Sequence, residues 1–279
     1  MNTATQLKAL IRNLSKEKNI NAQILLRNYM FERLLERISL SNYRHSFILK
    51  GGMLIATMVG LDTRSTMDMD ATIKGIPVTH ESIRLMFDEI CSISINDSVE
   101  MSVREIEDIH DEAEYAGLRV TLDTYFDRVN QTLKVDITTG DKITPKEISY
   151  SFKLMLEPRS IEVLAYNLET VIAEKMETII SRSTVNTRMR DFYDIYILSE
   201  VQAENINIGL LSDAIIATTN RRGTTDLLTR ADIILSNIED SQIMQNLWTR
   251  YQQKHDYAVG VSWQDVMSAI KGMFNSIGL

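Results

Sequence analysis

The sequence predicts an α+β fold with an all-helical C-terminal half, and three observations lead to that prediction. Residues 46–59 read as a short strand, a double-glycine turn and a helix. Apolar and polar residues alternate with strand period in three runs between 99 and 138. From Asn167 onward only helical periodicity is found. We therefore expect two domains, residues 1–165 and 166–279.

Each element is justified by its hydrophobic period and its flanking turn residues. Two amphipathic helices are expected at 3–16 and 22–39, where apolar residues follow a 3.6-residue period. The other elements of the first domain are expected at 46–49, 53–59, 67–73, 79–92, 99–107, 118–125 and 131–138, with a hairpin in 148–164. Asn167 is the expected N-cap of the first helix of the second domain. The helices of that domain are expected at 168–182, 188–200, 207–219, 225–236, 240–255 and 262–276.

Composition narrows the class of protein. The 279 residues are 44% hydrophobic and 24% charged, as in an ordinary globular protein. No apolar run approaches the roughly 20 residues of a membrane span, and the N-terminus lacks a secretory signal pattern. Cys91 is the single cysteine, which excludes an intrachain disulfide. These features predict a cytoplasmic protein.

Positive charge is concentrated at the N-terminus although the net charge is −8. Residues 1–50 hold nine Lys and Arg against three Glu. The basic positions on helical sequence are Lys8, Arg12, Lys16, Arg27, Arg33, Arg37 and Arg44. They could bind a nucleic-acid backbone, such as an RNA, or they could be a solvated helix face. Charge alone leaves both interpretations open.

Two carboxylates one residue apart are the first candidate for chemistry. In a strand, Asp68 and Asp70 would project from the same face and repel each other unless a cation lies between them. Mg²⁺ prefers such hard oxygen ligands together with substrate phosphates. The spacing also occurs by chance on solvated strands.

A third carboxylate strengthens the case for a metal site. Within 131–138, alternation buries Val135 and Ile137 and turns Asp136 to the opposite face. An aspartate in a strand interior runs against strand propensity, and completing a metal site with the first pair would explain it. Asp123 has the same parity and competes for this role, but its apolar neighbours alternate less regularly, so Asp136 is preferred.

The double glycine lies a short distance upstream. Gly51 and Gly52 stand between the expected strand and helix, where the backbone could approach a ligand and the helix N-terminus could offer N–H groups to phosphate oxygens. Taken alone, the pair is more often a tight turn.

A second polar cluster belongs to the helical half. Lys175 lies on one helix, and Asp191 and Asp194 are one turn apart on the next. Interhelical ion pairing explains these residues from their spacing. The alternative is that Lys175 reaches a triphosphate while Asp191 orients it or the attacking hydroxyl.

Five motifs in order resemble those of the AbiEii/AbiGii nucleotidyltransferase toxins, a family of the DNA polymerase beta-like superfamily. They are Leu49-Lys-Gly-Gly-Met, Arg64-Ser-Thr-x-Asp-x-Asp70, Lys134-Val-Asp136, Ala173-Glu-Lys175 and Arg190-Asp-Phe-Tyr-Asp194. The resemblance implies a minimal nucleotidyltransferase core, a mixed sheet flanked by helices, with N-terminal helices and a helical C-terminal half. It also implies that Asp68, Asp70 and Asp136 hold two Mg²⁺ ions, that Gly51 and Gly52 cradle phosphates, and that Lys175 and Asp191 form an essential pair.

The implied activity is transfer of a nucleotide from a nucleoside triphosphate to an RNA, for example a tRNA 3′ end, or to a protein. Relatives are typically toxins of bacterial abortive-infection or type IV toxin–antitoxin systems, which act in antiviral defence and have a separately encoded antitoxin. The chain departs from the family pattern at Met53, where many members have Ser or Thr. Backbone N–H groups or Ser65 would then contact the terminal phosphates. A nucleotide-binding interaction module without turnover is the alternative.

Overall fold

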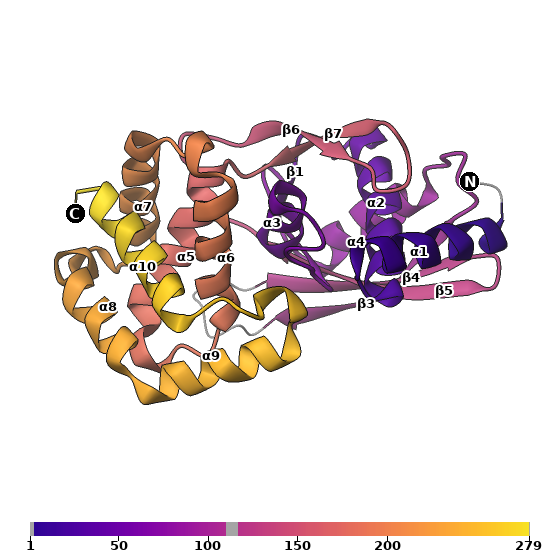
Figure 1. The fold of residues 1–279 in the computed structure, drawn as a ribbon. Helices are drawn as coiled ribbons and strands as arrows, with labels where there is room; N and C mark the ends of the chain where they lie inside the picture. Colours follow the sequence, from indigo (N-terminus) through magenta and orange to yellow (C-terminus); the bar gives the residue numbers. More distant parts are fainter. Residues whose placement is uncertain (1–2, 110–116, 279) are drawn as a thin grey trace. The chain divides into compact units, whose positions relative to one another are not determined.

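The computed structural model describes residues 3–109 and 117–278, and the chain divides into two compact units (Figure 1). The first unit comprises Met1–Asp141 and Glu147–Ala165, and the second comprises Lys142–Lys146 and Tyr166–Leu279. Each unit is treated separately below. In the part of the chain that the structure describes, no helix is both long enough and apolar enough to cross a membrane.

The first unit is built on one mixed sheet of seven strands. Its strands are β1 (Phe47–Lys50), β2 (Met69–Ile73), β3 (Glu100–Ile109), β4 (Gly117–Phe126), β5 (Val129–Thr138), β6 (Ile148–Lys153) and β7 (Ser160–Ala165). They lie in the order β3-β4-β5-β2-β1-β7-β6. β2 runs parallel to β5 and β1 parallel to β7, while all other neighbours are antiparallel. Asp70 lies on β2 and Asp136 on β5, and the glycine pair follows β1 directly.

Around Asp136 on β5 and Asp70 on β2, buried residues alternate with more exposed ones. Met69, Ala71, Val135 and Ile137 are fully buried. The residues between them therefore project from the other face. This is the parity expected for β5 from its sequence.

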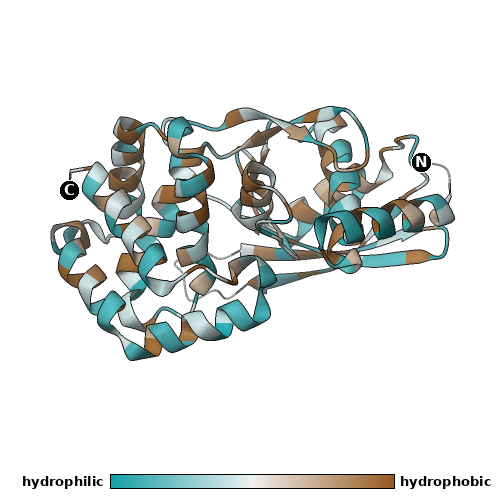
Figure 2. Cartoon of the chain, in the orientation of Figure 1, coloured by the Kyte–Doolittle hydropathy of each residue, from teal (hydrophilic) through white to brown (hydrophobic). Residues whose placement is uncertain are grey.

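The helices of this unit are α1 (Ala4–Lys18), α2 (Ala22–Leu40), α3 (Gly51–Val59) and α4 (His80–Ser92). α2 packs on β5 and β7, α4 packs on β3, and α3 contacts β1 and β2. Thr3 caps α1, and Thr79 and Ser82 form a capping box at α4. Figure 2 shows hydrophilic and hydrophobic residues alternating along α1, the pattern of a helix with one buried face.

The second unit consists of helices. They are α5 (Leu168–Arg182), α6 (Met189–Val201), α7 (Ile208–Arg222), α8 (Ala231–Asp240), α9 (Gln242–Lys254) and α10 (Trp263–Ser276), with short 3₁₀ turns at Ser183–Val185, Ala203–Asn205, Thr225–Arg230 and Asp256–Ala258. Asn167 is the N-cap of α5, as expected, and accepts from Thr170 N at 2.8 Å. Its side-chain amide also donates to Thr144 O at 2.7 Å and to Lys146 O at 3.2 Å. These bonds explain why residues 142–146 belong to the helical unit.

The α+β class and the all-helical C-terminal half are confirmed, with two local differences. β2 begins at Met69 rather than 67, so Asp68 lies in the bend before the strand, and Met67 is exposed instead of facing the core. The expected helix at 225–236 is a 3₁₀ turn followed by α8. Side chains three residues apart share a face in both kinds of helix, so the hydrophobic pattern does not separate them.

Candidate active site

The turn between β1 and α3 is shaped by two glycines that lie against side chains. Gly51 has a φ of +65°, and a Cβ there would lie 2.6 Å from Cγ of Asp70. A Cβ on Gly52 would lie 2.9 Å from Oγ1 of Thr66 and 3.0 Å from Nη2 of Arg64. The Gly52 N–H donates to Oδ2 of Asp70 at 3.3 Å. Gly51 therefore requires glycine, and a side chain at Gly52 would have to displace Thr66 or Arg64. The start of α3 already binds an anion, the carboxylate of Asp70.

Asp70 and Asp136 are brought together by strand register. β2 and β5 are parallel neighbours in which Asp70 pairs directly with Asp136. Neighbouring strands are about 4.8 Å apart, so two carboxylates meet on one face of the sheet. Asp136 follows the fully buried Val135 and its side chain is 21% exposed. The juxtaposition of two like charges is the arrangement that a cation relieves.

Arg119 of β4 supplies a positive charge on the other side of Asp136. The two residues are cross-strand partners. Arg119 Nε and Nη2 donate to Oδ1 and Oδ2 of Asp136 at 2.7 and 2.8 Å. The pKa of Arg119 is raised, first by these hydrogen bonds and then by the charge of Asp136, with a further contribution from Asp68. The guanidinium is thus a permanent cation near at least two of the three candidate ligands.

Asp68 lies next to this pair but outside the strand. It is half-buried in the bend before Met69, and its backbone carbonyl accepts from Oγ1 of Thr66 at 3.1 Å. Ser65, half-buried, lies in the same loop. In residues 3–109 and 117–278, no three His, Cys, Asp or Glu side chains are grouped closely enough to hold a metal ion by themselves.

Lys50 lies beside Asp70 on β1, where the two are cross-strand partners. Its Nζ donates to Thr138 Oγ1 at 2.8 Å and to Asp141 Oδ2 at 2.6 Å. Burial acts to raise the pKa of Asp141, but the charge and hydrogen bonds of Lys50 and a bond from Thr138 outweigh it and hold the pKa below its usual value. Lys50 is therefore held by Thr138 and Asp141 on the strand next to Asp70.

The competing third ligand, Asp123, lies elsewhere on the sheet. It pairs with Thr132 of β5, four residues along the strand from Asp136, which is about 13 Å. Its carboxylate is held by Arg104 of β3, with Nε to Oδ2 at 2.9 Å. The register therefore favours Asp136 over Asp123.

Met53 is fully buried, so its side chain belongs to the core of the unit. A phosphate at the start of α3 would therefore have to be contacted by backbone N–H groups or by a side chain of the 60–68 loop, such as Ser65.

In the helical unit, Lys175 is paired with two buried aspartates. Its Nζ contacts Oδ1 of Asp191 and lies 3.1 Å from Oδ2 of Asp194. Asp191 also accepts from Nε of Arg188 at 2.8 Å. Burial alone would lower the pKa of Lys175, but the charges of Asp191 and Asp194 more than offset it and the pKa is raised. Lys175 therefore carries a charge inside this cluster.

The basic positions at the N-terminus fall into two groups. Arg33 and Arg37 are buried in ion pairs, Arg33 with Glu157 at 3.0 Å and Arg37 with Asp97 at 2.8 Å. These two arginines are therefore not available to bind a nucleic-acid backbone, which the sequence had left open for them. The exposed positions are Lys8, Arg12, Lys16 and Arg44, and Arg27 is half-buried.

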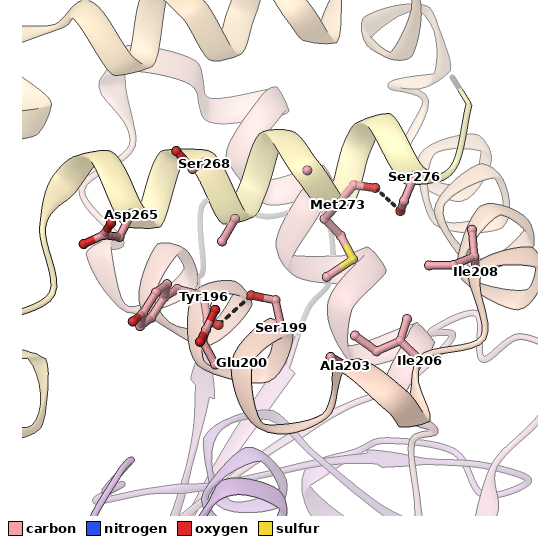
Figure 3. Close-up of a pocket in the computed structure, with 12 residues that line it drawn as sticks. Tyr196, Ser199, Glu200, Ala203, Ile206, Ile208, Asp265, Ser268, Met273 and Ser276 are labelled. Carbon is pink, nitrogen blue, oxygen red and sulfur yellow. Dashed lines mark hydrogen bonds between the residues drawn. The ribbon is translucent and has the colours of Figure 1, made fainter.

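A groove of about 740 Å³ lies within the helical unit between α6 and α10 (Figure 3). Tyr196, Ser199 and Glu200 line one side, and Asp265 and Met273 line the other. None of its lining residues was predicted as a site residue, and its charged members are carboxylates, which do not suit a phosphate ligand.

Comparison with known proteins decides the family. Residues 33–269 match the family of nucleotidyl transferase AbiEii toxins of type IV toxin–antitoxin systems. The chain belongs to the AbiEii family. Among curated proteins, none matches the chain. Two crystal structures are similar to it, a protein assigned as a nucleotidyltransferase from H. pylori and JHP933 from Helicobacter pylori. Each has 14% sequence identity to this chain and a TM-score of 0.50. Each alignment covers 92% of this chain, and it covers 97% of the first of those chains and 94% of the second.

The similarity to these structures confirms a nucleotidyltransferase-like fold for this AbiEii protein. The AbiEii match begins within α2, so α1 precedes it. Two side chains around the aspartates were not predicted from the sequence, Lys50 and Arg119. Strand alternation could have indicated Arg119, because its neighbours Leu118 and Val120 are buried and Arg119 therefore projects from the same face as Asp136. Its register could not be known without the sheet.

Proposed function

We propose that this AbiEii protein transfers a nucleotide from a nucleoside triphosphate to a hydroxyl acceptor, with Mg²⁺ at Asp68, Asp70 and Asp136. The observation that carries the proposal is the register of Asp70 with Asp136 beside the N-terminus of α3. Two adjacent carboxylates suit Mg²⁺, which takes one or two protein carboxylates and completes its shell with phosphates and water. Asp68, two residues before Asp70, would be the third ligand.

In the reaction the acceptor oxygen forms a bond to the α-phosphorus. The bond from that phosphorus to the oxygen bridging to the β-phosphate breaks, pyrophosphate leaves, and the hydroxyl proton passes to water. Divalent ions held by the three aspartates would lower the pKa of the acceptor hydroxyl and neutralise the departing pyrophosphate. The aspartates hold and orient these groups. Backbone N–H groups at Gly51 and Gly52, with Ser65, would contact the phosphates.

Lys175 and Asp191 are proposed as the essential pair of the helical unit. Their ion pair with Asp194 also stabilises that unit, so loss of activity in a Lys175 variant must be compared with loss of stability. Arg222 and Glu177 provide a matched control, because they form another largely buried ion pair of the same unit. If Lys175→Met abolishes transfer while an equally destabilised Arg222→Met retains it, the pair acts in the reaction. Equal losses in both would indicate a structural role.

The proposed acceptor is an RNA held by the exposed face of α1. Lys8, Arg12 and Lys16 recur every four residues, so they form a stripe with about 6 Å between neighbours along the helix axis. α1 ends near the loop that leads to Asp68, since Lys18 contacts Asp62 at 3.7 Å. A stripe of cations suits a phosphate backbone. We further propose a separately encoded antitoxin as partner, a role in abortive infection and a cytoplasmic location, on the strength of the family.

Label transfer tests the proposal. The full chain is incubated with labelled nucleoside triphosphates, Mg²⁺ and total RNA, and compared with Asp70→Asn and Asp136→Asn. Both variants are expected to lose transfer, while Asp123→Asn, the off-register carboxylate on the neighbouring strand, retains it. Equal transfer by wild type and Asp70→Asn would contradict the proposal. Tight triphosphate binding without transfer to RNA or to protein would favour a binding module instead.

A further inference from the structure

Five charged side chains form one row across the sheet of the first unit. Strand register places Lys50 opposite Asp70, Asp70 beside Asp136, Asp136 opposite Arg119, and Arg119 opposite Glu107. Residues paired in this way project from the same face. The row therefore has two adjacent negative charges at its centre and a positive charge on each side of them.

Each central carboxylate has protein partners in this structure. Oδ2 of Asp70 accepts from the backbone N–H of Gly52 at 3.3 Å. Asp136 is held more strongly, because the planar guanidinium of Arg119 donates to both of its oxygens at 2.7 and 2.8 Å. A metal ion shared by the two aspartates needs at least one of the oxygens of Asp136.

We propose that Arg119 is a built-in cation that competes with the divalent ion for Asp136. The inference rests on the proposed function, because it concerns the same metal site. In the absence of the ion, Arg119 neutralises Asp136 and relieves its repulsion with Asp70. To bind, the ion must ligate an Asp136 oxygen that already accepts a hydrogen bond from Arg119, and the like charges of the ion and the guanidinium repel each other, so each weakens the binding of the other.

This competition has a consequence for the order of loading. A guanidinium released from a carboxylate binds phosphate oxygens with the same two-pronged geometry. The triphosphate of an incoming nucleotide offers such oxygens, and they could replace the hydrogen bonds between Arg119 and Asp136. The ion alone offers no such replacement. The site should therefore bind the ion weakly by itself and more strongly together with a triphosphate.

Mn²⁺ binding to the full chain, measured by electron paramagnetic resonance without nucleotide, tests the proposal. Arg119→Gln removes the competing charge, and we expect its Kd for Mn²⁺ to fall at least tenfold relative to wild type. Mn²⁺ should also raise the melting temperature of Arg119→Gln more than that of wild type. Arg104→Gln is the matched control, because it breaks the other cross-strand Arg–Asp pair on β4 and should leave Mn²⁺ affinity unchanged.

The remaining variants keep the outcomes distinct. Adding Asp70→Asn to Arg119→Gln should abolish the gain in Mn²⁺ affinity, which would place the ion at Asp70. If Arg119→Gln does not fold, Arg119→Lys serves, because an ammonium cannot hold both oxygens, and about a threefold gain is expected. Equal or weaker Mn²⁺ binding in these variants than in wild type overturns this inference alone. Failure of every protein to bind Mn²⁺, with or without a triphosphate, overturns the proposed function and this inference with it.

Discussion

Gly51→Ala is expected to destabilise the first unit by about 2.5–5 kcal/mol. The φ of +65° at this position costs a residue with a Cβ about 1–2 kcal/mol. The new methyl would also overlap the carboxylate of Asp70 and displace it. The charge-assisted hydrogen bond from Gly52 N–H to Asp70 would then be lost, at about 1.5–3 kcal/mol.

Gly75→Ala separates the two contributions. Gly75 has a φ of +79°, but no atom lies within 4 Å of a Cβ built there, so only the backbone penalty of about 1–2 kcal/mol applies. Equilibrium urea unfolding of both variants, with the midpoint read at unchanged slope, gives the comparison. A free energy of unfolding that falls no further in Gly51→Ala than in Gly75→Ala would refute the contact between the turn and Asp70.

Three further predictions concern charge. Burial raises the pKa of Glu32 to about 8, above its unfolded value of 4.5, so the folded state favours the neutral form. The free energy of unfolding should therefore fall by up to about 1.4 kcal/mol per pH unit as pH rises from about 4.5 to 8. Urea titrations at several pH values measure this profile, and Glu32→Gln should flatten it. Arg37→Ala should destabilise the protein by about 3–5 kcal/mol in the same assay, because it leaves the buried Asp97 unpaired, and a loss below 1 kcal/mol would contradict the buried pair. Replacing the stripe Lys8, Arg12 and Lys16 with Gln should weaken RNA binding in filter-binding titrations and lower the slope of log K against log salt by about 2–3, whereas an unchanged slope would exclude the stripe from the interface.

Much of the fold follows from local patterns in the sequence. Asn167 signals the start of α5 by capping chemistry, and the alternation around Asp136 gives the correct buried face of β5. These features depend on residues within one turn or one strand of each other, which the sequence displays directly.

The arrangement of the candidate site depends on strand register, which the sequence does not display. Parity could not separate Asp123 from Asp136, because both project from the same face. Register separates them by placing Asp136, and not Asp123, beside Asp70. The partnership of Arg119 with Asp136 arises in the same way, from the pairing of β4 with β5.

A second gap is the state of charged residues. The sequence shows that Arg33 and Arg37 are basic, but not that the fold buries them against carboxylates. Net charge along a segment therefore overstated the cationic surface of the N-terminal helices. Burial of this kind depends on tertiary packing and has no local signature.

Anomalous diffraction from crystals grown with Mn²⁺ and a non-hydrolysable nucleoside triphosphate tests the central claim most directly. We predict a Mn²⁺ peak within about 2.0–2.5 Å of carboxylate oxygens of both Asp70 and Asp136, with the nucleotide phosphates at the start of α3. A peak that lies away from both aspartates, with Asp136 still bound by both nitrogens of Arg119, would contradict the claim.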